Sequence, residues 1–154
     1  MVHFKNVGGK IMINLKKLLP EDHIETTNQI LTWQEAVQLA SQPQLNEKAI
    51  DQQYVTNMIH SVEENGPYMV LADYFALMHA RPGEGVFHQG MSLLVTKNEI
   101  DLAGKPVRIF LVLAAKDSQS HLESLQEIME VFMDQEKYQL ILNGDKEQIC
   151  QLFQ

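Results

Sequence analysis

The sequence contains very little cysteine and no long apolar run. Cys150 is the one cysteine among 154 residues, and a single cysteine cannot close an intrachain disulfide, which favours a reducing compartment. No stretch approaches the roughly 20 consecutive apolar residues that a membrane-spanning helix requires. The first residues also lack the apolar segment of a signal peptide. We therefore expect a cytoplasmic protein that does not insert into a membrane.

Basic side chains are scarce as well. The chain has 12 Lys and Arg residues against 20 Asp and Glu residues, which gives a formal net charge of −8. General binding to nucleic acid requires a basic face. The charge balance therefore argues against a nucleic-acid partner.

The common motifs of cofactor and metal chemistry are missing from the sequence. There is no GxxxxGK loop for a nucleotide phosphate and no GxSxG turn for a serine nucleophile. No HxxxH pair or Cys/His cluster has the spacing of metal ligands. We therefore expect neither a cofactor nor a metal centre.

The length of the chain predicts a single domain. A domain of 154 residues buries roughly 68–70% of the surface that its unfolded chain exposes, which is enough for a substantial core. Gly8 and Gly9 lie in a loose N-terminal stretch. We expect residues 1–11 to form a disordered leader and residues 12–154 to form the domain.

The spacing of apolar residues predicts helices that alternate with short strands. Residues 107–114 form the clearest central strand, and residues 23–30 have the polar, β-branched composition of an edge strand. The other expected strands are 68–72 (short and buried), 75–78 and 90–96, and the expected helices are 12–19, 33–41, 46–64, 121–132, 135–142 and 146–153. This alternation predicts an α/β fold with helices on both faces of one sheet.

Local signals fix several element boundaries. Thr32 and Glu35 form a capping box at the start of one helix, and Ser120 with Glu123 forms a second, so that a helix is expected to begin at His121. Residues 101–106 read DLAGKP, which is typical of a turn between two strands.

Two of the six histidines occupy positions that suit chemistry. His79 follows an apolar strand and precedes a Pro-Gly turn, and His121 opens the helix that follows the central strand. Ligands of open α/β sheets bind near the carboxyl ends of the strands. If both loops lie at that edge, the two imidazoles can share one pocket.

Neutral imidazole is a nucleophile, and histidine is largely unprotonated at neutral pH. The positive end of a helix disfavours protonation of a histidine in its first turn, so His121 is expected to remain neutral and to offer one N–H. A helix start also attracts phosphate. Together with the missing metal motifs, these features suggest phosphoryl transfer through a phosphohistidine on His79, a reaction that needs mainly positioning and electrostatic stabilisation.

The residues alone leave structural alternatives open. A histidine at a strand end is more often a satisfied structural residue, and a histidine at a helix start is usually incidental. Arg81 would ordinarily be a solvated loop charge or an ion-pair partner. On position alone, the structural interpretation of His79 stays ahead of the functional one.

Two segments resemble the enzyme IIA components of the bacterial sugar phosphotransferase system. Residues 68–95 read YMVLADYFALMHARPGEGVFHQGMSLLV, and in the family an apolar run likewise leads into Pro-His-Ala-Arg-Pro. Residues 111–132 read LVLAAKDSQSHLESLQEIMEVF, which is similar to the family's apolar strand, polar loop and helix opened by a histidine. The resemblance covers residues 12–153 and points to the ascorbate-specific branch of the mannitol/fructose-type superfamily.

The resemblance implies a fold and a reaction cycle. The fold would be a three-layer α/β/α sandwich with a mixed sheet of roughly five strands. The phosphocarrier protein HPr would phosphorylate His79, and His79 would pass the group to a cysteine of enzyme IIB, which serves uptake of an ascorbate- or pentitol-like carbohydrate through membrane enzyme IIC. His121 matches the family's second active-site histidine and would stabilise the phosphoryl group. Arg81, Ser118 and Ser120 are the expected binding residues.

Other functions of the same fold remain open. A regulatory phosphoacceptor would signal by binding a target, and a degenerate paralogue would keep His79 only for structure. A homodimer is also left open.

The sequence departs from the family pattern near His79. Met78 stands where the family usually has proline, and Asp73 and Tyr74 stand where a Pro-Gly pair is common. We expect Met78 to loosen the backbone before the nucleophile and Tyr74 to crowd the mouth of the site. Tyr74, Phe75 and Phe87 are the expected apolar lining of a shallow docking surface around His79.

Overall fold

The computed structural model describes residues 15–154. The expected leader 1–11, the expected domain start at residue 12 and the first residues of the expected helix 12–19 lie outside the described residues. Residues 15–18 are helical, and the helix ends before Pro20 as predicted.

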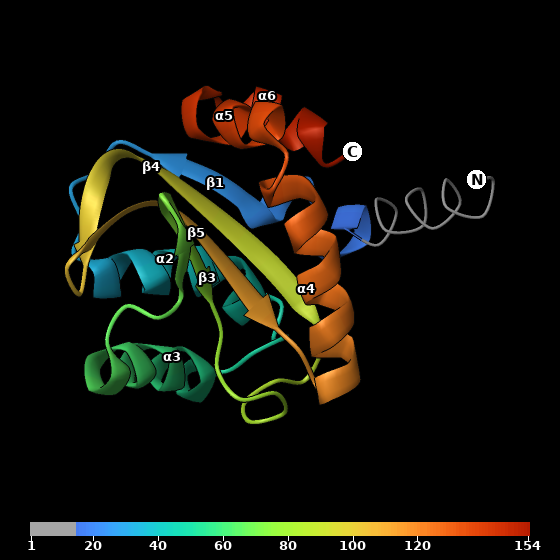
Figure 1. Ribbon diagram of the computed structural model, residues 1–154. Coiled ribbons are helices and arrows are strands. Elements are labelled where there is room, and N and C mark those ends of the chain that lie inside the picture. The colour runs from blue at the N-terminus through green and yellow to red at the C-terminus, as the bar shows by residue number, and fades with distance from the viewer. Residues whose placement is uncertain (1–14) are drawn as a thin grey trace.

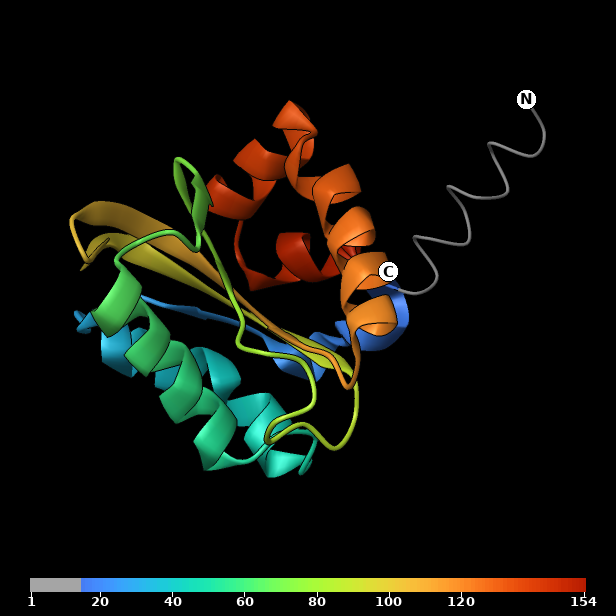
Figure 2. The same cartoon turned by 60° about the horizontal axis from the view of Figure 1, so that its bottom comes forward.

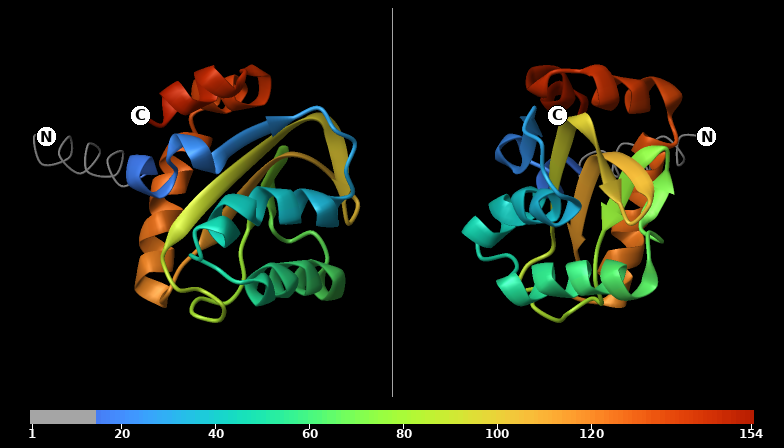
Figure 3. Two further views of the ribbon diagram at one scale, coloured as in Figure 1. Left: turned by 180° about the vertical axis from the view of Figure 1, so that it is seen from behind. Right: turned by 90° about the vertical axis from the view of Figure 1, so that its left-hand side faces the viewer.

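The core of the fold is a five-stranded mixed sheet (Figure 1). Its spatial order is β1-β4-β5-β3-β2. The strands are β1 (Ile24–Thr27), β2 (Val70–Ala72), β3 (Tyr74–Met78), β4 (Gly90–Leu102) and β5 (Lys105–Ala114). Strand β1 runs parallel to β4 along one edge (Figure 3), β4 is antiparallel to β5, β5 is parallel to β3, and β2 closes the other edge antiparallel to β3.

Helices cover both faces of this sheet, which confirms the predicted three-layer α/β/α architecture (Figure 2). One face carries α2 (Trp33–Asn46) and α3 (Gln52–Asn65). The other carries α4 (Ser118–Phe132), α5 (Gln135–Asn143) and α6 (Lys146–Leu152). A short 3-10 helix, η1 (Glu21–His23), leads into β1.

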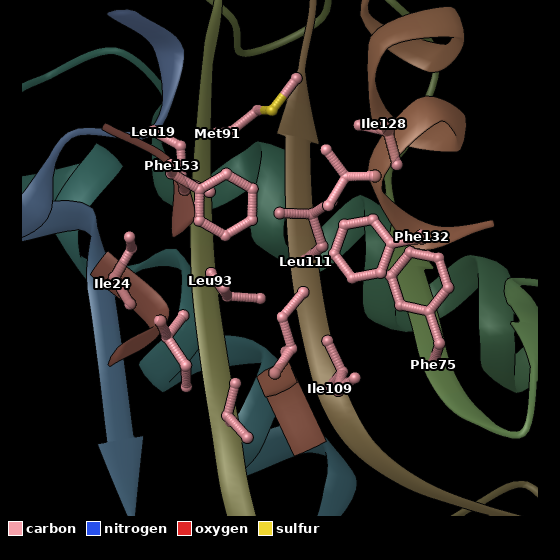
Figure 4. Packing of buried hydrophobic residues seen from close by; sticks show 14 of the residues in the cluster. Leu19, Ile24, Phe75, Met91, Leu93, Ile109, Leu111, Ile128, Phe132 and Phe153 are labelled. Carbon is pink, nitrogen blue, oxygen red and sulfur yellow. The ribbon is translucent and has the colours of Figure 1, made fainter. Parts of the chain in front are cut away.

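Each face of the sheet has its own apolar core, because successive side chains of a strand point to opposite faces. Along β5, Leu111 belongs to the cluster under α4, α5 and α6, whereas Phe110 belongs to the cluster under α2 and α3. In the first cluster the rings of Phe75 and Phe132 are stacked, with centroids 4.2 Å apart (Figure 4). This pair fastens β3 to the end of α4.

The helices on the first face differ from prediction at one boundary. The Thr32–Glu35 capping box is present, but α2 continues past Ser41 to Asn46 with Pro43 inside it. The next helix begins at Gln52 instead of residue 46, because the Asp51 carboxylate accepts a hydrogen bond from the Tyr54 amide and caps it. The apolar residues just before Asp51 lie in an irregular connection but are still buried. Their spacing in the sequence therefore resembles that of a helix.

The hairpin between β4 and β5 also differs from prediction. The turn lies within the expected range 101–106 but is shorter, because the ladder continues through the pair Leu102–Lys105. Only Ala103 and Gly104 form the turn, and both have positive φ angles, 51° and 103°. A two-residue turn with two positive φ angles matches the twist of the strands that it joins. Strand β2 is exposed rather than buried, with Leu71 at 49% exposure.

The start of α4 lies three residues before the predicted one. Asp117 is the N-cap, and its carboxylate accepts a 2.8 Å hydrogen bond from the Ser120 amide. The expected capping role of Ser120 is therefore wrong, and His121 lies in the first turn rather than at the first helical position. Asp134 and Asp145 cap α5 and α6, and the predicted Asp134 cap is confirmed.

Candidate functional site

The two candidate histidines meet at one edge of the sheet. Strands β3 and β5 are parallel neighbours, so His79 after β3 and α4 after β5 emerge at the same edge. The rings of His79 and His121 have centroids 5.4 Å apart and are tilted by 48°. Figures 1 and 2 show the loop after β3 passing beside the first turns of α4. The predicted proximity of these two imidazoles is confirmed.

The orientation of His79 is fixed by its own strand. Its Nδ1 lies 2.8 Å from the carbonyl oxygen of Leu77. Because a carbonyl oxygen can only accept, Nδ1 carries the hydrogen and donates it. The neutral ring therefore presents Nε2 with a free lone pair. The side chain is partly buried, which leaves one side of the ring accessible.

The backbone next to His79 is held by a buried tyrosine. The hydroxyl of Tyr54 on α3 donates to the carbonyl oxygen of Leu113 at 2.6 Å and accepts from the amide of Ala80 at 3.1 Å. Burial raises the pKa of Tyr54 to about 12, against an opposing effect of the Ala80 hydrogen bond. The hydroxyl therefore remains protonated and joins the ends of β3 and β5. From the sequence, Tyr54 has the pattern of an ordinary core residue.

The loop that follows His79 is fastened at two glycines. Gly83 has a φ of +97° and donates its amide to the carbonyl of Ala115 at 3.0 Å. Gly85 has a φ of +73°, and its carbonyl accepts from the Asp51 amide at 3.0 Å. A Cβ on Gly85 would lie 3.0 Å from the backbone nitrogen of Tyr54. Only glycine suits this position, because both the angle and the space are restricted.

Gln89 connects the same loop to α4. Its side-chain amide donates to the Ser124 hydroxyl at 2.6 Å and to the Ser120 carbonyl at 3.3 Å. The strand that leads out of the loop is thus bonded to the first turns of the helix that carries His121. Nothing in the sequence around Gln89 indicates this role, since the bond joins residues more than 30 positions apart.

His121 is tuned toward its neutral form. Partial burial lowers the pKa of His121, and the charge of the neighbouring His79 lowers it further. The predicted direction is the same, although the leading cause is burial rather than the helix terminus. A hydrogen bond from the Ser120 amide lowers the pKa of the exposed Asp117 carboxyl. Asp117 is therefore anionic and partly offsets the positive end of α4.

The two histidines line a surface pocket of about 510 Å³. Its other walls come from the loop after His79 and from one side of α3. The complete lining is Asn57, His60, Ser61, Glu64, Asn65, Tyr68, His79, Ala80, Arg81, Pro82, Glu84 and His121. The α3 wall was missed from the sequence, because its polar residues look like an ordinary solvated helix face. One signal was available: His60, Glu64 and Ser61 recur at helical spacing on that face.

Only one of the three expected binding residues lines the pocket. Arg81 is exposed and lines the pocket. Ser118 and Ser120 lie in the first turn of α4 but do not line it. The Ser120 amide is engaged by the Asp117 cap.

Two of the expected docking residues lie away from His79. Phe75 is only 1% exposed and stacks in the core, so its predicted surface role is wrong. Tyr74 starts β3, at the opposite end of the strand from His79, and lines a separate pocket with Asp73 and Lys105. The predicted crowding of the site mouth by Tyr74 is therefore also wrong. Phe87 is 52% exposed on the loop after His79, as expected.

Met78 fills the core instead of forming part of the site's surface. Its side chain is fully buried in the cluster under α2 and α3, and its backbone pairs with Val112 of β5. The position before His79 is thus held by packing. In residues 15–154 there is no helix long and apolar enough to cross a membrane.

Comparison with known proteins decides the family. Residues 17–154 match the family described as "Phosphoenolpyruvate-dependent sugar phosphotransferase system, EIIA 2". The chain belongs to this family. The suspected resemblance is thereby confirmed, and the protein is a component of a sugar phosphotransferase system.

Relatives of this enzyme IIA are named for two different carbohydrates, mannitol and ascorbate. The mannitol-specific cryptic phosphotransferase enzyme IIA component of Escherichia coli K12 is 29% identical over 137 residues, covering 88% of this chain and 93% of its own. The ascorbate-specific PTS system EIIA component of the same strain is 33% identical over 111 residues, covering 70% of this chain and 72% of its own. The family is therefore shown, and the sugar is not fixed by similarity.

Solved structures confirm the fold. The solution structure of the mannitol-specific cryptic enzyme IIA from Escherichia coli superposes with a TM-score of 0.85 at 28% identity, covering 90% of this chain and 97% of that one. The mixed five-stranded sheet between two helical layers is thus the fold of this enzyme IIA family.

Proposed function

We propose that His79 is the phosphoryl carrier of this enzyme IIA. It accepts the phosphoryl group from phospho-HPr and passes it to a cysteine of a cognate enzyme IIB, for carbohydrate uptake through a membrane enzyme IIC. The observation that supports this most directly is the 2.8 Å bond from His79 Nδ1 to the Leu77 carbonyl. That bond leaves Nε2 as the nucleophilic nitrogen of a residue that lines an open pocket.

The transfer proceeds as two displacements at phosphorus. The Nε2 lone pair of His79 attacks phosphorus, an N–P bond forms, and the bond between phosphorus and the donor breaks. Phosphorylated imidazole carries positive charge, and the Leu77 carbonyl that accepts from Nδ1 stabilises that charge. A cysteine thiolate of enzyme IIB then attacks phosphorus, the S–P bond forms, and the N–P bond returns its electron pair to Nε2.

His121 stabilises the phosphoryl group in this proposal. Its ring lies beside that of His79, and its lowered pKa keeps it neutral with one N–H to donate. A neutral donor stabilises the phosphoryl oxygens without adding a full positive charge that would hold them back from the next acceptor. Such balance suits a carrier, which must both accept and release the group.

Arg81 contributes the cationic contact at the rim of the pocket. A guanidinium can bind two phosphoryl oxygens at once, and Arg81 is exposed on the pocket wall. Ser118 and Ser120 do not line the pocket, so in this proposal their side of α4 contacts the surface of the partner protein instead of the phosphoryl group.

A labelling experiment tests the proposal. The protein is incubated with phosphoenolpyruvate, enzyme I and HPr, and acid-labile phosphate is measured. We expect label on the wild type and none on His79→Ala, whereas His60→Ala, from the same pocket, keeps its label. An unlabelled wild type beside a labelled control enzyme IIA would overturn the proposal.

The carbohydrate is the finer part of the proposal. We assign an ascorbate- or pentitol-like carbohydrate, supported by the relative named for ascorbate. The relative named for mannitol, a six-carbon sugar alcohol, supports the alternative outcome. The rates of transfer from the phosphorylated protein to the enzyme IIB of an ascorbate system and to that of a mannitol system would measure which system it prefers. Equal slow transfer to both would contradict this assignment while leaving the His79 chemistry intact.

A further inference from the structure

A buried histidine outside the His79 pocket has one ring nitrogen without a hydrogen-bond partner. His23 ends η1 and is only 5% exposed. Its Nδ1 lies 2.7 Å from the carbonyl oxygen of Met91 at the start of β4. Because the carbonyl must accept, Nδ1 carries the hydrogen. The buried Nε2 has no hydrogen-bond partner in residues 15–154.

Two carboxylates stand beside this nitrogen. Nε2 of His23 lies 3.0 Å from Oε1 of Glu47, which follows the last residue of α2, but the pair lacks the geometry of a hydrogen bond. Asp22 supplies a second carboxylate, and one ligand atom from each of the three residues lies within 4.8 Å of the others. We propose that Asp22, His23 and Glu47 bind a divalent transition-metal ion of the zinc class.

The spacing of the ligand atoms fits one shared ion. Zinc binds nitrogen and oxygen ligands at about 2.0–2.2 Å, which places neighbouring ligands of a tetrahedral site about 3.3 Å apart. The observed 3.0 Å between Nε2 and Oε1 is close to that value. Asp22 and Glu47 are exposed, so their carboxylates can rotate to complete the set. A water molecule would take the fourth position.

The bond from Nδ1 to Met91 prepares His23 as a ligand. A metal-binding histidine usually donates its other ring N–H to a carbonyl or carboxylate, which fixes the tautomer and the ring orientation. The bond to the Met91 carbonyl is of this kind, and it leaves Nε2 as the donor atom. Together, a neutral His23 and the two carboxylates carry two negative charges, which a divalent cation neutralises.

The ligand set selects among cations. Magnesium and calcium prefer six or more oxygen ligands, whereas imidazole nitrogen favours zinc and its neighbours in the transition series. No local pattern in the sequence indicates this cluster, because Glu47 lies 24 positions after His23. The fold brings them together where η1 packs against α2 and β4. This inference does not rest on the proposed function.

An ion pair between protonated His23 and Glu47 is the competing explanation, and zinc titration separates the two. The full chain, treated with a chelator and dialysed, is titrated with zinc chloride by calorimetry. Both His79→Gln and His121→Gln are present in the background, because that histidine pair can itself take zinc. We expect this background to bind one equivalent of zinc through the proposed site.

Conservative variants of the carboxylates identify the ligands. Glu47→Gln and Asp22→Asn should lose the bound equivalent, while Glu21→Gln, an exposed acid in the same 3-10 helix, should retain it. These surface changes preserve the fold, whereas His23→Gln also removes the bond to Met91. Zinc should raise the unfolding temperature of the background and of Glu21→Gln, and leave that of Glu47→Gln unchanged. Absence of zinc binding, or equal binding by Glu47→Gln and Glu21→Gln, would overturn the proposal in favour of the ion pair.

Discussion

The hydroxyl of Tyr54 accepts a 3.1 Å hydrogen bond from the backbone amide of Ala80. Ala80 follows the proposed phosphoryl carrier, so a helix on one face of the sheet positions the backbone next to the residue where the chemistry is expected. The same hydroxyl donates to Leu113 at the end of β5. One buried oxygen therefore holds three elements in register: α3, the end of β3 and the end of β5.

Removing this hydroxyl should weaken both stability and transfer. In Tyr54→Phe a partly buried amide and a buried carbonyl each lose a hydrogen bond, which costs about 1–3 kcal/mol. Urea unfolding measures this loss, and the rate of labelling by phospho-HPr should fall because the backbone after His79 is less restrained. The hydroxyl of Tyr138 is buried without a hydrogen-bond partner in residues 15–154, so Tyr138→Phe is the matched control. An equal loss in both variants would contradict the bridging role of Tyr54.

The titration of His121 should depend on His79. Because burial is the main cause of its lowered pKa and the charge of His79 the second, the pKa of His121 should rise part of the way to its ordinary value in His79→Gln. NMR titration of the ring signals measures this directly. His88→Gln, an exposed change on the loop after His79, should leave the titration where it is. A His121 titration that does not respond to His79→Gln would contradict the electrostatic coupling.

The same shift sets the sign of a pH dependence in stability. His121 binds a proton less readily in the folded state than in the unfolded chain, where histidine has a pKa of about 6.5. Stability from this group is therefore complete above about pH 6.5 and is lost as pH falls toward the lowered folded pKa. The difference in unfolding free energy between wild type and His121→Gln should shrink over that window. A difference that grows on acidification would show the opposite shift.

The methionine before His79 should matter through packing. Met78 is fully buried, so Met78→Ala should cost about 2–5 kcal/mol by leaving a cavity, whereas Met78→Leu should cost less than about 1.5 kcal/mol. Denaturant unfolding measures both. Met133 is 70% exposed, and Met133→Ala should change stability by no more than about 0.5 kcal/mol. A Met78→Ala variant as stable as Met133→Ala would show that Met78 does not fill the core.

Gly85 should tolerate no side chain. Gly85→Ala adds a Cβ against Asp51 and Tyr54 at a positive φ, and should cost about 1–3 kcal/mol through overpacking beyond the backbone strain. Gly104 also has a positive φ but open space around it, so Gly104→Ala reports the strain alone. Comparison of the two by urea unfolding isolates the contribution of the contact. Equal losses would mean that the loop moves to admit the methyl group.

The sequence predicted those parts of the site that follow strands. The apolar runs before His79 and before α4 read as strands, and parallel neighbours end at a common edge, so the two histidines were expected to meet. Helix starts were less secure, because Asp117 and Ser120 both have side chains that cap helices. The cap falls on Asp117, since its carboxylate reaches the Ser120 amide. The capping-box pattern predicted Ser120, and the path of the chain out of β5 places the cap at Asp117 instead.

Contacts between residues that are far apart along the chain could not be predicted from local sequence patterns. Tyr54 and Gln89 act on partners 26 and 35 positions away, and nothing near either residue identifies those partners. Phe75 was expected at the surface because it precedes His79 closely, but side chains alternate along a strand and its face is the one beneath α4. The α3 wall of the pocket has the composition of any solvated helix face. Its contribution depends on how the helix packs, which a local pattern does not record.

The pocket takes His60 from α3 and His121 from α4, which belong to opposite helical layers. Neither layer contains the whole site, and neither of the two apolar cores can loosen without shifting one wall against the other. The geometry of the site therefore depends on both helical layers and on the sheet between them. As the protein is heated, competence to carry a phosphoryl group should disappear together with the fold, without an interval in which an intact scaffold carries a disabled site.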